Sequence, residues 1–307
     1  MSNRDGTNGI DMNKGAIKRG KKWINPKTAP YIFIAPAVLL FLTFTLYPVI
    51  DSLITSFYTK QGSESVFVGF QNYTKLFQDK LFYKALFNTF ILLIFQVPIM
   101  LSVAVFLAVI LNSALLKAKG FFRSTYFLPA VTSLVTASII FVILLDQSKG
   151  LVNYFLGFFN INPIPWLNHS VWAKVSIILV ITWRWTGYNM VILLAGLQGI
   201  SKDYYEAASI DGAGKIRQFF SITLPLLKPV LLFTAVLSTI GTLQLFDEPY
   251  IITDGGPNNA TLTVIMYLYN NGFRYFDFGF ASAIAYVLVI IIAILSYLQM
   301  KVAGDKE

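Results

Sequence analysis

The chain has 307 residues, of which 56% are hydrophobic and only 13% are charged. Soluble domains carry about 25% charged residues, so this composition excludes an ordinary soluble protein and indicates an integral membrane protein. The chain has no cysteine, which excludes a thiol nucleophile, a disulfide and a thiolate metal site, and its only histidine, His169, cannot form a metal site alone.

Six apolar stretches are long enough for the roughly 20 residues that a bilayer core requires. They cover residues 31–50, 86–111, 124–145, 175–196, 230–246 and 280–299. The first stretch is not followed by the small-residue cleavage pattern of a signal peptide, so we expect it to remain in the protein. The sequence therefore predicts an all-α membrane protein with six transmembrane helices. In this interpretation a basic tail (1–29) precedes a transmembrane domain (30–303), and 304–307 form the C-terminus.

The basic residues are distributed unevenly among the connecting segments. Most of the 24 lysines and arginines lie in the tail, in the loop between the second and third spans, in the loop 201–228 and at the C-terminus. Basic residues near span ends are retained in the cytoplasm, so both termini and the loop 201–228 are predicted to be cytoplasmic. The net charge of +9 is explained by membrane insertion and attraction to anionic lipid, so we expect no nucleic-acid partner.

The fourth predicted span contains a charged residue, Arg184. An ionised side chain well inside a span costs several kcal/mol unless it faces water or a partner, and such residues are functional by default. Asp247, beyond the end of the fifth span, is one candidate partner, and a group on a second subunit is another. A structural ion pair between the two helices and a direct contact with a transported solute are both open.

The loop 201–228 contains a defined pattern of residues. It reads Glu206, Ala207, Ala208, then Asp211 and Gly212, and, after nine intervening residues, Ile222, Leu224 and Pro225. Asp203, with Glu206 three positions on, is expected to cap a short helix. The alanines provide helix without bulk that can enter a groove on a partner, where the Glu206 carboxylate can meet a basic residue. We expect a compact helix-turn-helix unit in water.

The second half of this loop is bounded by glycine and proline. Gly212 permits a turn at positive φ. Residues 215–223 are predicted to form a second short helix, which Pro225 and Pro229 stop or redirect. The stretch 212–216 has a glycine and a lysine, but it lacks P-loop spacing and the Ser or Thr that must follow the lysine. No nucleotide site and no catalytic cluster are expected in this chain, so any energy from ATP has to come from a separate subunit.

After the fifth span the chain reads Gly255, Gly256 and Pro257, which predicts a rigid bend preceded by permissive residues. A role for this outer loop in a docking surface and a simple interhelical turn are both open.

The pattern in the loop 201–228 matches, at every defining position, the cytoplasmic coupling loop of ABC importer permease subunits. Other segments resemble the carbohydrate-uptake group of these binding-protein-dependent permeases, which are relatives of the larger maltose-transporter permease. They are Phe67-Val68-Gly69-Phe70-Gln71-Asn72-Tyr73, Gly150-Leu151-Val152-Asn153, Trp183-Arg184-Trp185-Thr186-Gly187 and Thr253-Asp254-Gly255-Gly256-Pro257. The similarity extends from about residue 30 to residue 301.

The resemblance implies a permease subunit in a bacterial cell membrane that forms half of a translocation pathway for a sugar or oligosaccharide. Its implied partners are a second homologous permease, two ATP-binding subunits at the cytoplasmic face, and an extracytoplasmic solute-binding protein. ATP and Mg²⁺ belong to the ATP-binding subunits, and no cofactor is expected in this chain. The large inserted outer domain of the maltose relative is absent, so docking of the binding protein must use the loops 51–84, 146–174 and 253–279.

A path for a neutral polyol needs hydroxyl, amide and aromatic groups that bind weakly. The candidates on the fourth and fifth spans are Trp183, Arg184, Tyr188, Asn189, Gln244 and Asp247. Thr234, Ser238, Gly241 and Thr242 recur at helical spacing, and for these small residues helix packing is favoured over solute contact.

Two alternatives are open at this stage. One is an ABC permease for a non-sugar solute such as a polyamine or a peptide. The other is an ion-coupled secondary transporter, which is disfavoured because such proteins need titratable carboxylates deep in several spans.

Overall fold

The computed structural model describes residues 27–61, 64–113 and 117–304, and divides the chain into two compact units at Asp51. The first unit contains α1 (Ala29–Phe41), a π-helical turn η1 (Leu42–Leu46) and the start of α2 (Tyr47–Thr55). Nearly all of its described side chains are exposed, although most are apolar. The stretch Ala29–Thr55 is long and apolar enough to cross a membrane, and lipid is the environment that suits such a surface.

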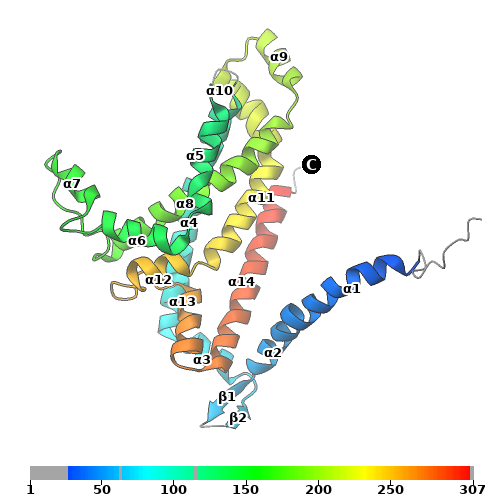
Figure 1. Ribbon diagram of the computed structural model, residues 1–307, viewed down its shortest axis with the longest axis vertical. Helices are drawn as coiled ribbons and strands as arrows, with labels where there is room; N and C mark the ends of the chain where they lie inside the picture. Colours follow the sequence, from blue (N-terminus) through cyan, green and yellow to red (C-terminus); the bar gives the residue numbers. More distant parts are fainter. Residues whose placement is uncertain (1–26, 62–63, 114–116, 305–307) are drawn as a thin grey trace, which may run out of the picture. The chain divides into compact units, whose positions relative to one another are not determined.

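The second unit contains an antiparallel hairpin and a set of helices. The hairpin pairs β1 (Tyr58–Gln61) with β2 (Glu64–Phe67), and Tyr58 lies opposite Phe67. The helices are α3 (Gln71–Gln78), α4 (Lys80–Asn112), α5 (Lys119–Val131), α6 (Leu134–Leu144), α7 (Leu151–Gly157), α8 (Ser170–Gln198), α9 (Lys202–Ile210), α10 (Lys215–Gln218), η2 (Phe219–Thr223), α11 (Leu224–Leu243), α12 (Asp247–Thr253), α13 (Val264–Tyr269), η3 (Asn270–Arg274) and α14 (Phe278–Gly304). Helices α9 and α10 lie at one end of this unit and the hairpin lies at the other (Figure 1).

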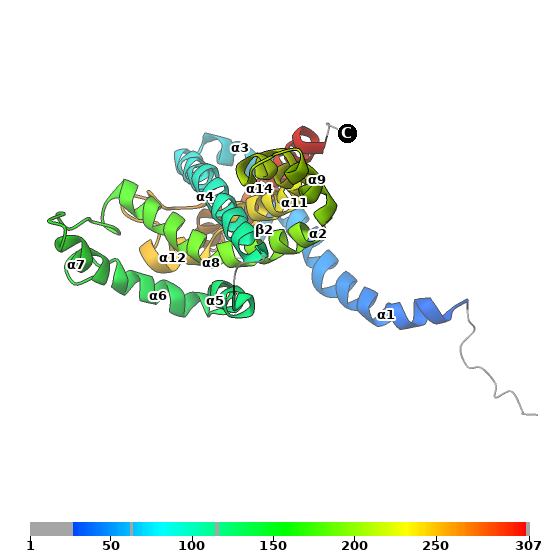
Figure 2. The same cartoon turned by 90° about the horizontal axis from the view of Figure 1, so that it is seen from above.

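The third predicted span is not one straight helix. Helices α5 and α6 are bent by 94° at Thr132 and Ser133. Pro129 cannot donate a hydrogen bond to the turn before it, and the Thr132 hydroxyl donates to the Leu128 carbonyl at 2.9 Å, where α5 ends. By length and composition the described residues contain five helices that can cross a membrane, or six if this bent pair is one span. Figure 2 shows α5, α6 and α7 following one another along one side of the unit.

The fifth span also differs from the prediction, at both ends. Residues 215–223 do not form a separate helix, because α10, η2 and α11 are continuous from Lys215 to Leu243. The expectation that Pro225 and Pro229 stop the helix is therefore wrong. In η2 the backbone register shifts, so that the N–H of Leu224 donates to Phe219 O, and Pro225 falls in the first turn of α11, where a missing N–H is tolerated. At its other end α11 stops at Leu243, and Asp247 begins a separate helix, α12.

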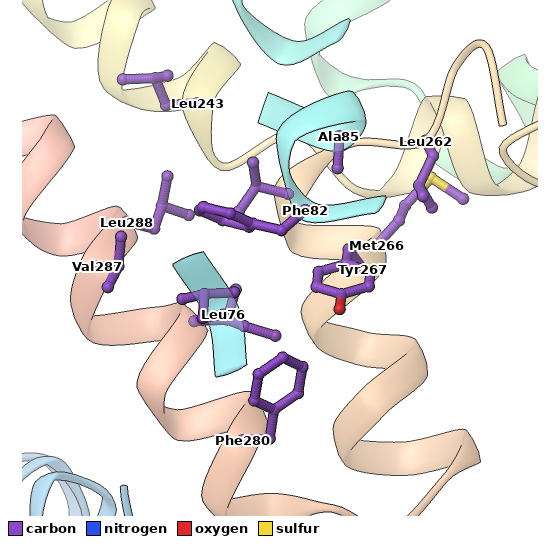
Figure 3. Close-up of a cluster of buried hydrophobic side chains, with 12 residues drawn as sticks. Leu76, Phe82, Ala85, Leu243, Leu262, Met266, Tyr267, Phe280, Val287 and Leu288 are labelled. Atoms are coloured by element: carbon purple, nitrogen blue, oxygen red, sulfur yellow. The ribbon is translucent and has the colours of Figure 1, made fainter. Parts of the chain in front are cut away.

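Buried apolar side chains form one cluster near the hairpin end and another toward the α9 end. In the first, Phe82 of α4 and Leu76 of α3 lie between α14, which provides Leu288, and α13, which provides Tyr267 (Figure 3). The second joins α4, α8 and α11 through small and aliphatic residues, among them Ala104, Ala108, Leu193, Leu197 and Leu227. Together the clusters fix α4, α8, α11, α13 and α14 as the scaffold of the unit.

Two glycines allow backbones to touch. A β-carbon at Gly187 of α8 would lie 1.7 Å from Tyr126 O of α5, and one at Gly279 of α14 would lie 1.9 Å from Tyr58 O of β1. No other residue fits at either contact without a shift of the backbone. Gly187 therefore sets how closely α5 crosses α8, next to the predicted pathway residues of α8.

Candidate solute cavity and coupling loop

The N-cap of helix α9 lies two residues earlier than the capping pattern predicted. Ser201 is the N-cap, with extended backbone, and its hydroxyl accepts a hydrogen bond from the Asp203 N–H at 3.3 Å. Asp203 is therefore not the N-cap: it already lies inside the helix, and its carboxylate accepts from the Ser201 hydroxyl at 3.0 Å. Glu206 and Ala207 are exposed on the helix that follows, and Ala208 is half-buried.

The turn after α9 is a Schellman motif. Gly212 has φ of +76°, as the sequence predicted. The N–H of Ala213 donates to Ala208 O at 2.8 Å and the N–H of Gly212 to Ser209 O at 3.1 Å. These two bonds satisfy carbonyls that the end of a helix would otherwise leave unpaired. Asp211 is the C-cap, so the part of the motif from Ala208 to Gly212 forms the C-terminus of α9.

Side chains that the motif does not include lock this turn to the start of the next helix. The Gln218 amide, 4% exposed, donates to the Ser209 hydroxyl at 2.8 Å and to Ala213 O at 3.0 Å. The hydroxyls of Tyr205 and Thr223 lie 3.1 Å apart. The sequence reasoning missed these four residues, although a glutamine in an apolar helical stretch is a signal that it needs a partner.

The outward surface of the loop is apolar as well as charged. Ile210 is 87% exposed and Ile216 is 78% exposed. Ile222 and Leu224 are half-buried where η2 meets α11, and Pro225 is exposed. Large aliphatic side chains this exposed on a rigid helix pair are typical of a surface that another protein covers.

A cavity of about 260 Å³ lies among α4, α8, α11 and α12. Four of the six predicted pathway residues line it: Tyr188, Asn189, Gln244 and Asp247. Trp183 and Arg184 do not. Trp183 points to the other side of α8, where its ring packs against Phe141 of α6 with 5.1 Å between ring centroids.

Arg184 is buried, with 7% of its surface exposed, and it forms no ion pair with Asp247 within the described residues. Its guanidinium lies 5.7 Å from the ring centroid of Trp185, which lines the cavity. The neighbour of Asp247, Glu248, also lines the cavity and is only 3% exposed. From the sequence, Asp247 and Glu248 near the outer end of the fifth span either serve an outer gate or merely meet water. The burial of Glu248 excludes the second role for this residue.

Hydrogen bonds across helices shape the wall of the cavity. The Thr242 hydroxyl donates to Gln96 Oε1 of α4 at 2.9 Å, and the Ser238 hydroxyl donates to Asn189 Oδ1 of α8 at 3.3 Å. Ser238, Gly241 and Thr242 line the cavity, whereas Thr234 is buried away from it and donates to its own helix at Val230 O. The small-residue stripe therefore serves packing at Thr234 and forms cavity wall at the other three positions. Gln96 is a further lining residue that the sequence reasoning missed.

The outer bend is held against α4. Gly255 has φ of +78°, and the Gly256–Pro257 peptide is cis. The Asn88 amide of α4 donates to Asn259 O at 2.8 Å and to Leu262 O at 3.1 Å. The ammonium of Lys84 donates to Asn258 O at 2.6 Å. The bend is thus fixed by side chains of one long helix.

The loop between α6 and α8 is organised by Asn153, whose side chain donates to Gln147 O and Ile164 O and accepts from the Trp166 indole N–H at 3.0 Å. At the start of this loop the N–H of Lys149 and the N–H and hydroxyl of Ser148 donate to Asp146, and they hold the pKa of its carboxyl below the ordinary value. The motif Gly150 to Asn153 therefore forms a folded outer segment.

Among the described residues no group of three or more His, Asp or Glu side chains could hold a metal ion. Apolar spans, a cavity whose wall mixes apolar and polar side chains, and an exposed helix pair are typical of membrane transport subunits.

The chain belongs to the family of binding-protein-dependent transport system inner membrane components, whose family model matches residues 27–303. It is therefore a permease subunit of an ABC importer. It is 47% identical over 282 residues to the lactose transport system permease protein LacF of Rhizobium radiobacter, covering 90% of this chain and 94% of the relative. It is 40% identical to the arabinooligosaccharides transport system permease protein AraP of Bacillus subtilis, covering 91% of this chain and 90% of that one.

A solved structure shares the fold. The match is to a bacterial ABC transporter involved in the import of the acidic polysaccharide alginate, with a TM-score of 0.80, 22% sequence identity, and coverage of 91% of this chain and 96% of that chain. The likeness therefore covers most of the fold described above.

Proposed function

We propose that this permease conducts an uncharged sugar or oligosaccharide, and that its cavity is half of the pathway. The observation that carries the proposal is the lining of the cavity. It combines amides from Gln96, Asn189 and Gln244, hydroxyls from Ser238 and Thr242, and the aromatic rings of Trp185 and Tyr188. These groups offer weak, distributed contacts to a polyol. The names of the two relatives above, which refer to lactose and to arabinooligosaccharides, support the same class of cargo.

The charge of the lining favours an uncharged sugar over an acidic one. Asp247 and Glu248 line the cavity, and among the described residues no lysine or arginine does. Two carboxylates in a confined space repel a uronate, whose carboxylate would be desolvated beside them. The alginate importer, which shares the fold, has an acidic cargo, so this half of the pathway is expected to differ in charge from its counterpart there.

A polyamine is the second candidate, because the same two carboxylates would attract a cation. Peptides have no such observation in their favour. Direct uptake assays separate the two remaining candidates. A sugar permease takes up labelled sugar even when spermidine is in excess, whereas a polyamine permease takes up labelled spermidine and no sugar.

The surface from Ser201 to Lys228 is proposed to bind an ATP-binding subunit, which supplies ATP and Mg²⁺. Support comes from the exposed Ile210 and Ile216 beside the Glu206 carboxylate. The Schellman turn at Gly212 and the Gln218 bonds make α9 and the start of α11 one body. A movement of the bound subunit is then passed to α11, which lines the cavity, without loss in a flexible loop.

The remaining partners and the topology follow from this placement. The α9 end is cytoplasmic, together with both termini, and the hairpin and the bend at Gly255 are extracytoplasmic, where a solute-binding protein docks. A second homologous permease completes the pathway. The domain boundaries are those of a basic tail (1–29), a transmembrane domain (30–303) and a short C-terminus. Trp183, which faces Phe141, is left out of the solute path.

The test is affinity purification of the chain from its native membrane, with every co-purifying protein identified by mass spectrometry. Recovery of an ATPase, a second permease and a binding protein is expected, and sugar screening of that binding protein then identifies the cargo. Recovery of the chain alone would contradict the coupling assignment. A binding protein that retains spermidine and no sugar would replace the proposed cargo with the second candidate.

One variant tests the coupling surface directly. Glu206→Ala removes an exposed carboxylate and leaves α9 intact, because alanine is a strong helix former. We expect sugar uptake to fall at least tenfold and co-purification of the ATPase to weaken, with unchanged membrane insertion. Lys301→Ala, an exposed charged position near the end of α14 and outside this surface, is the control and should behave like the unaltered protein. Unchanged uptake in Glu206→Ala would count against the assignment.

A further inference from the structure

Two opposite charges are buried close to the cavity without satisfying each other. Nε and Nη1 of Arg184 and Oε1 of Glu248 have no hydrogen-bond partner within the described residues. No ion pair joins the two side chains there. Burial raises the pKa of the Glu248 carboxyl, and the nearby charge of Arg184 opposes that shift. Buried charged groups are normally paired, and an unpaired acceptor in a protein interior costs about 1–3 kcal/mol. Among the described side chains that have a buried polar atom without a partner, these two are the ones that can carry a charge; the others are Ser138, Thr182, Ser296 and Gln299.

The two side chains are placed differently with respect to the cavity. Glu248 lines it, in the first turn of α12. Arg184 does not line it and lies against Trp185, which does. Helix α12 packs on both α6 and α8, so Glu248 is held at the junction of three helices. Glu248 is thus part of the cavity wall, where its Oε1 atom is buried, and Arg184 lies outside the wall.

The amides of Gln96 and Asn189 in the wall, and the hydroxyls of Thr242 and Ser238, already have partners. Gln96 accepts from Thr242, and Asn189 accepts from Ser238 and donates to Trp185 O. Their hydrogen bonds would have to be exchanged before they could bind a solute. Glu248 Oε1 needs no exchange, and a carboxylate oxygen forms a hydrogen bond about twice as strong as a neutral acceptor does.

We propose that Glu248 is a solute-binding residue that accepts a hydrogen bond from a sugar hydroxyl, and that Arg184 is a positioning residue that holds its carboxylate toward the cavity. This inference rests on the proposed sugar transport and deepens it. The preferred cargo is uncharged because it must donate to a carboxylate, and a hydroxyl does so without bringing a second negative charge into the site.

The experiment uses the complete transporter, with its partner permease, ATPase and binding protein, in proteoliposomes with radiolabelled lactose, maltose and trehalose as probes. Glu248→Gln keeps the shape and removes the charge. We expect uptake of the transported sugar to fall about tenfold, while ATP hydrolysis stimulated by the binding protein changes less than twofold. A structural defect would reduce both together. Thr234→Val is the control, because it removes a buried hydroxyl that lies away from the cavity, and it should leave the ratio of uptake to hydrolysis unchanged.

A second variant separates the two roles. If Arg184 acts through Glu248, then Glu248→Gln combined with Arg184→Gln should lose no more uptake than Glu248→Gln alone. Additive losses would overturn the positioning role of Arg184. Wild-type uptake by Glu248→Gln, or equal losses of uptake and hydrolysis, would overturn the role of Glu248. A wild-type transporter that carries none of the three probes and no other uncharged sugar that its binding protein retains would overturn the proposed function, and this inference with it, before any variant is measured.

Discussion

The loop 201–228 and the cavity differ in how completely their buried polar side chains are hydrogen-bonded. In the loop Gln218, Ser209, Tyr205 and Thr223 are bonded to one another or to nearby backbone. Around the cavity Arg184 and Glu248 are buried with polar atoms that have no partner among the described residues. Satisfied networks make a region rigid, whereas an unsatisfied group favours the arrival of a partner. One region is built to keep its shape under load, and the other to bind a ligand that enters and leaves.

The largest effect is expected where Gly187 of α8 contacts the backbone of α5. Gly187→Ala places a methyl group 1.7 Å from the backbone oxygen of Tyr126. The clash is relieved only if the backbones of α5 and α8 move apart. We expect a loss of about 3 kcal/mol, measured as thermal stability in detergent, because overpacking forces α5 from α8. Gly120→Ala, where no atom lies within 4 Å, should cost little or be stabilising. Hydrogen exchange of residues 205–218 should stay unchanged in both, and a loosened coupling loop in Gly187→Ala would break the separation of the two regions.

The next effect is expected within the coupling loop. Gln218→Leu removes two hydrogen bonds that a buried amide donates, to Ser209 Oγ and Ala213 O. We expect a local cost of about 2 kcal/mol, visible as faster hydrogen exchange in residues 205–218 and as weaker coupling of hydrolysis to uptake. Gln198→Leu, an exposed position at the end of α8, is the control. Exchange in Gln218→Leu at the wild-type rate would show that the loop does not depend on this network.

A smaller effect is expected at the turn itself. Gly212→Val forces a β-branched residue to φ of +76°, although its side chain would meet no atom within 4 Å. The cost is therefore one of backbone conformation, about 1–2 kcal/mol. Gly214→Val is the matched control, because Gly214 has φ of −69° and equally open surroundings. Equal exchange rates at residues 208–213 in the two variants would contradict the left-handed turn.

Tyr205→Phe is expected to have the smallest effect. It removes one hydroxyl that lies 3.1 Å from Thr223 Oγ1 in a half-buried position. The expected loss is about 0.5–1 kcal/mol, measured as hydrogen exchange of the Thr223 region. The adjacent Tyr204→Phe, whose side chain is exposed, should show no change. A larger effect at Tyr204 than at Tyr205 would place the contact with the ATPase, rather than the internal bond, in control of the loop.

The sequence predicted the loop better than the cavity, for a physical reason. The turn at Gly212 depends on neighbours within six residues, so the local pattern contains the information. Gln96 and Thr242 are 146 positions apart and meet only after α4 and α11 pack. Glu248 and Asp247 are equivalent in the sequence, and only the orientation of α12 buries one of them. The break between α5 and α6 was missed because the average hydropathy of a segment does not show whether its helix axis changes direction.

Helix α4 has a consequence for communication across the membrane. Its 33 residues extend about 50 Å at 1.5 Å per residue. Near its start Lys84 and Asn88 hold the outer bend, midway Gln96 contacts the cavity wall, and toward its end Ala104 and Ala108 pack on α8 and α11. One helix is therefore in contact with the bend, with the cavity wall and with the packing of α8 and α11. A change in the tilt of this one helix would reach all three levels together, without a relay through loops.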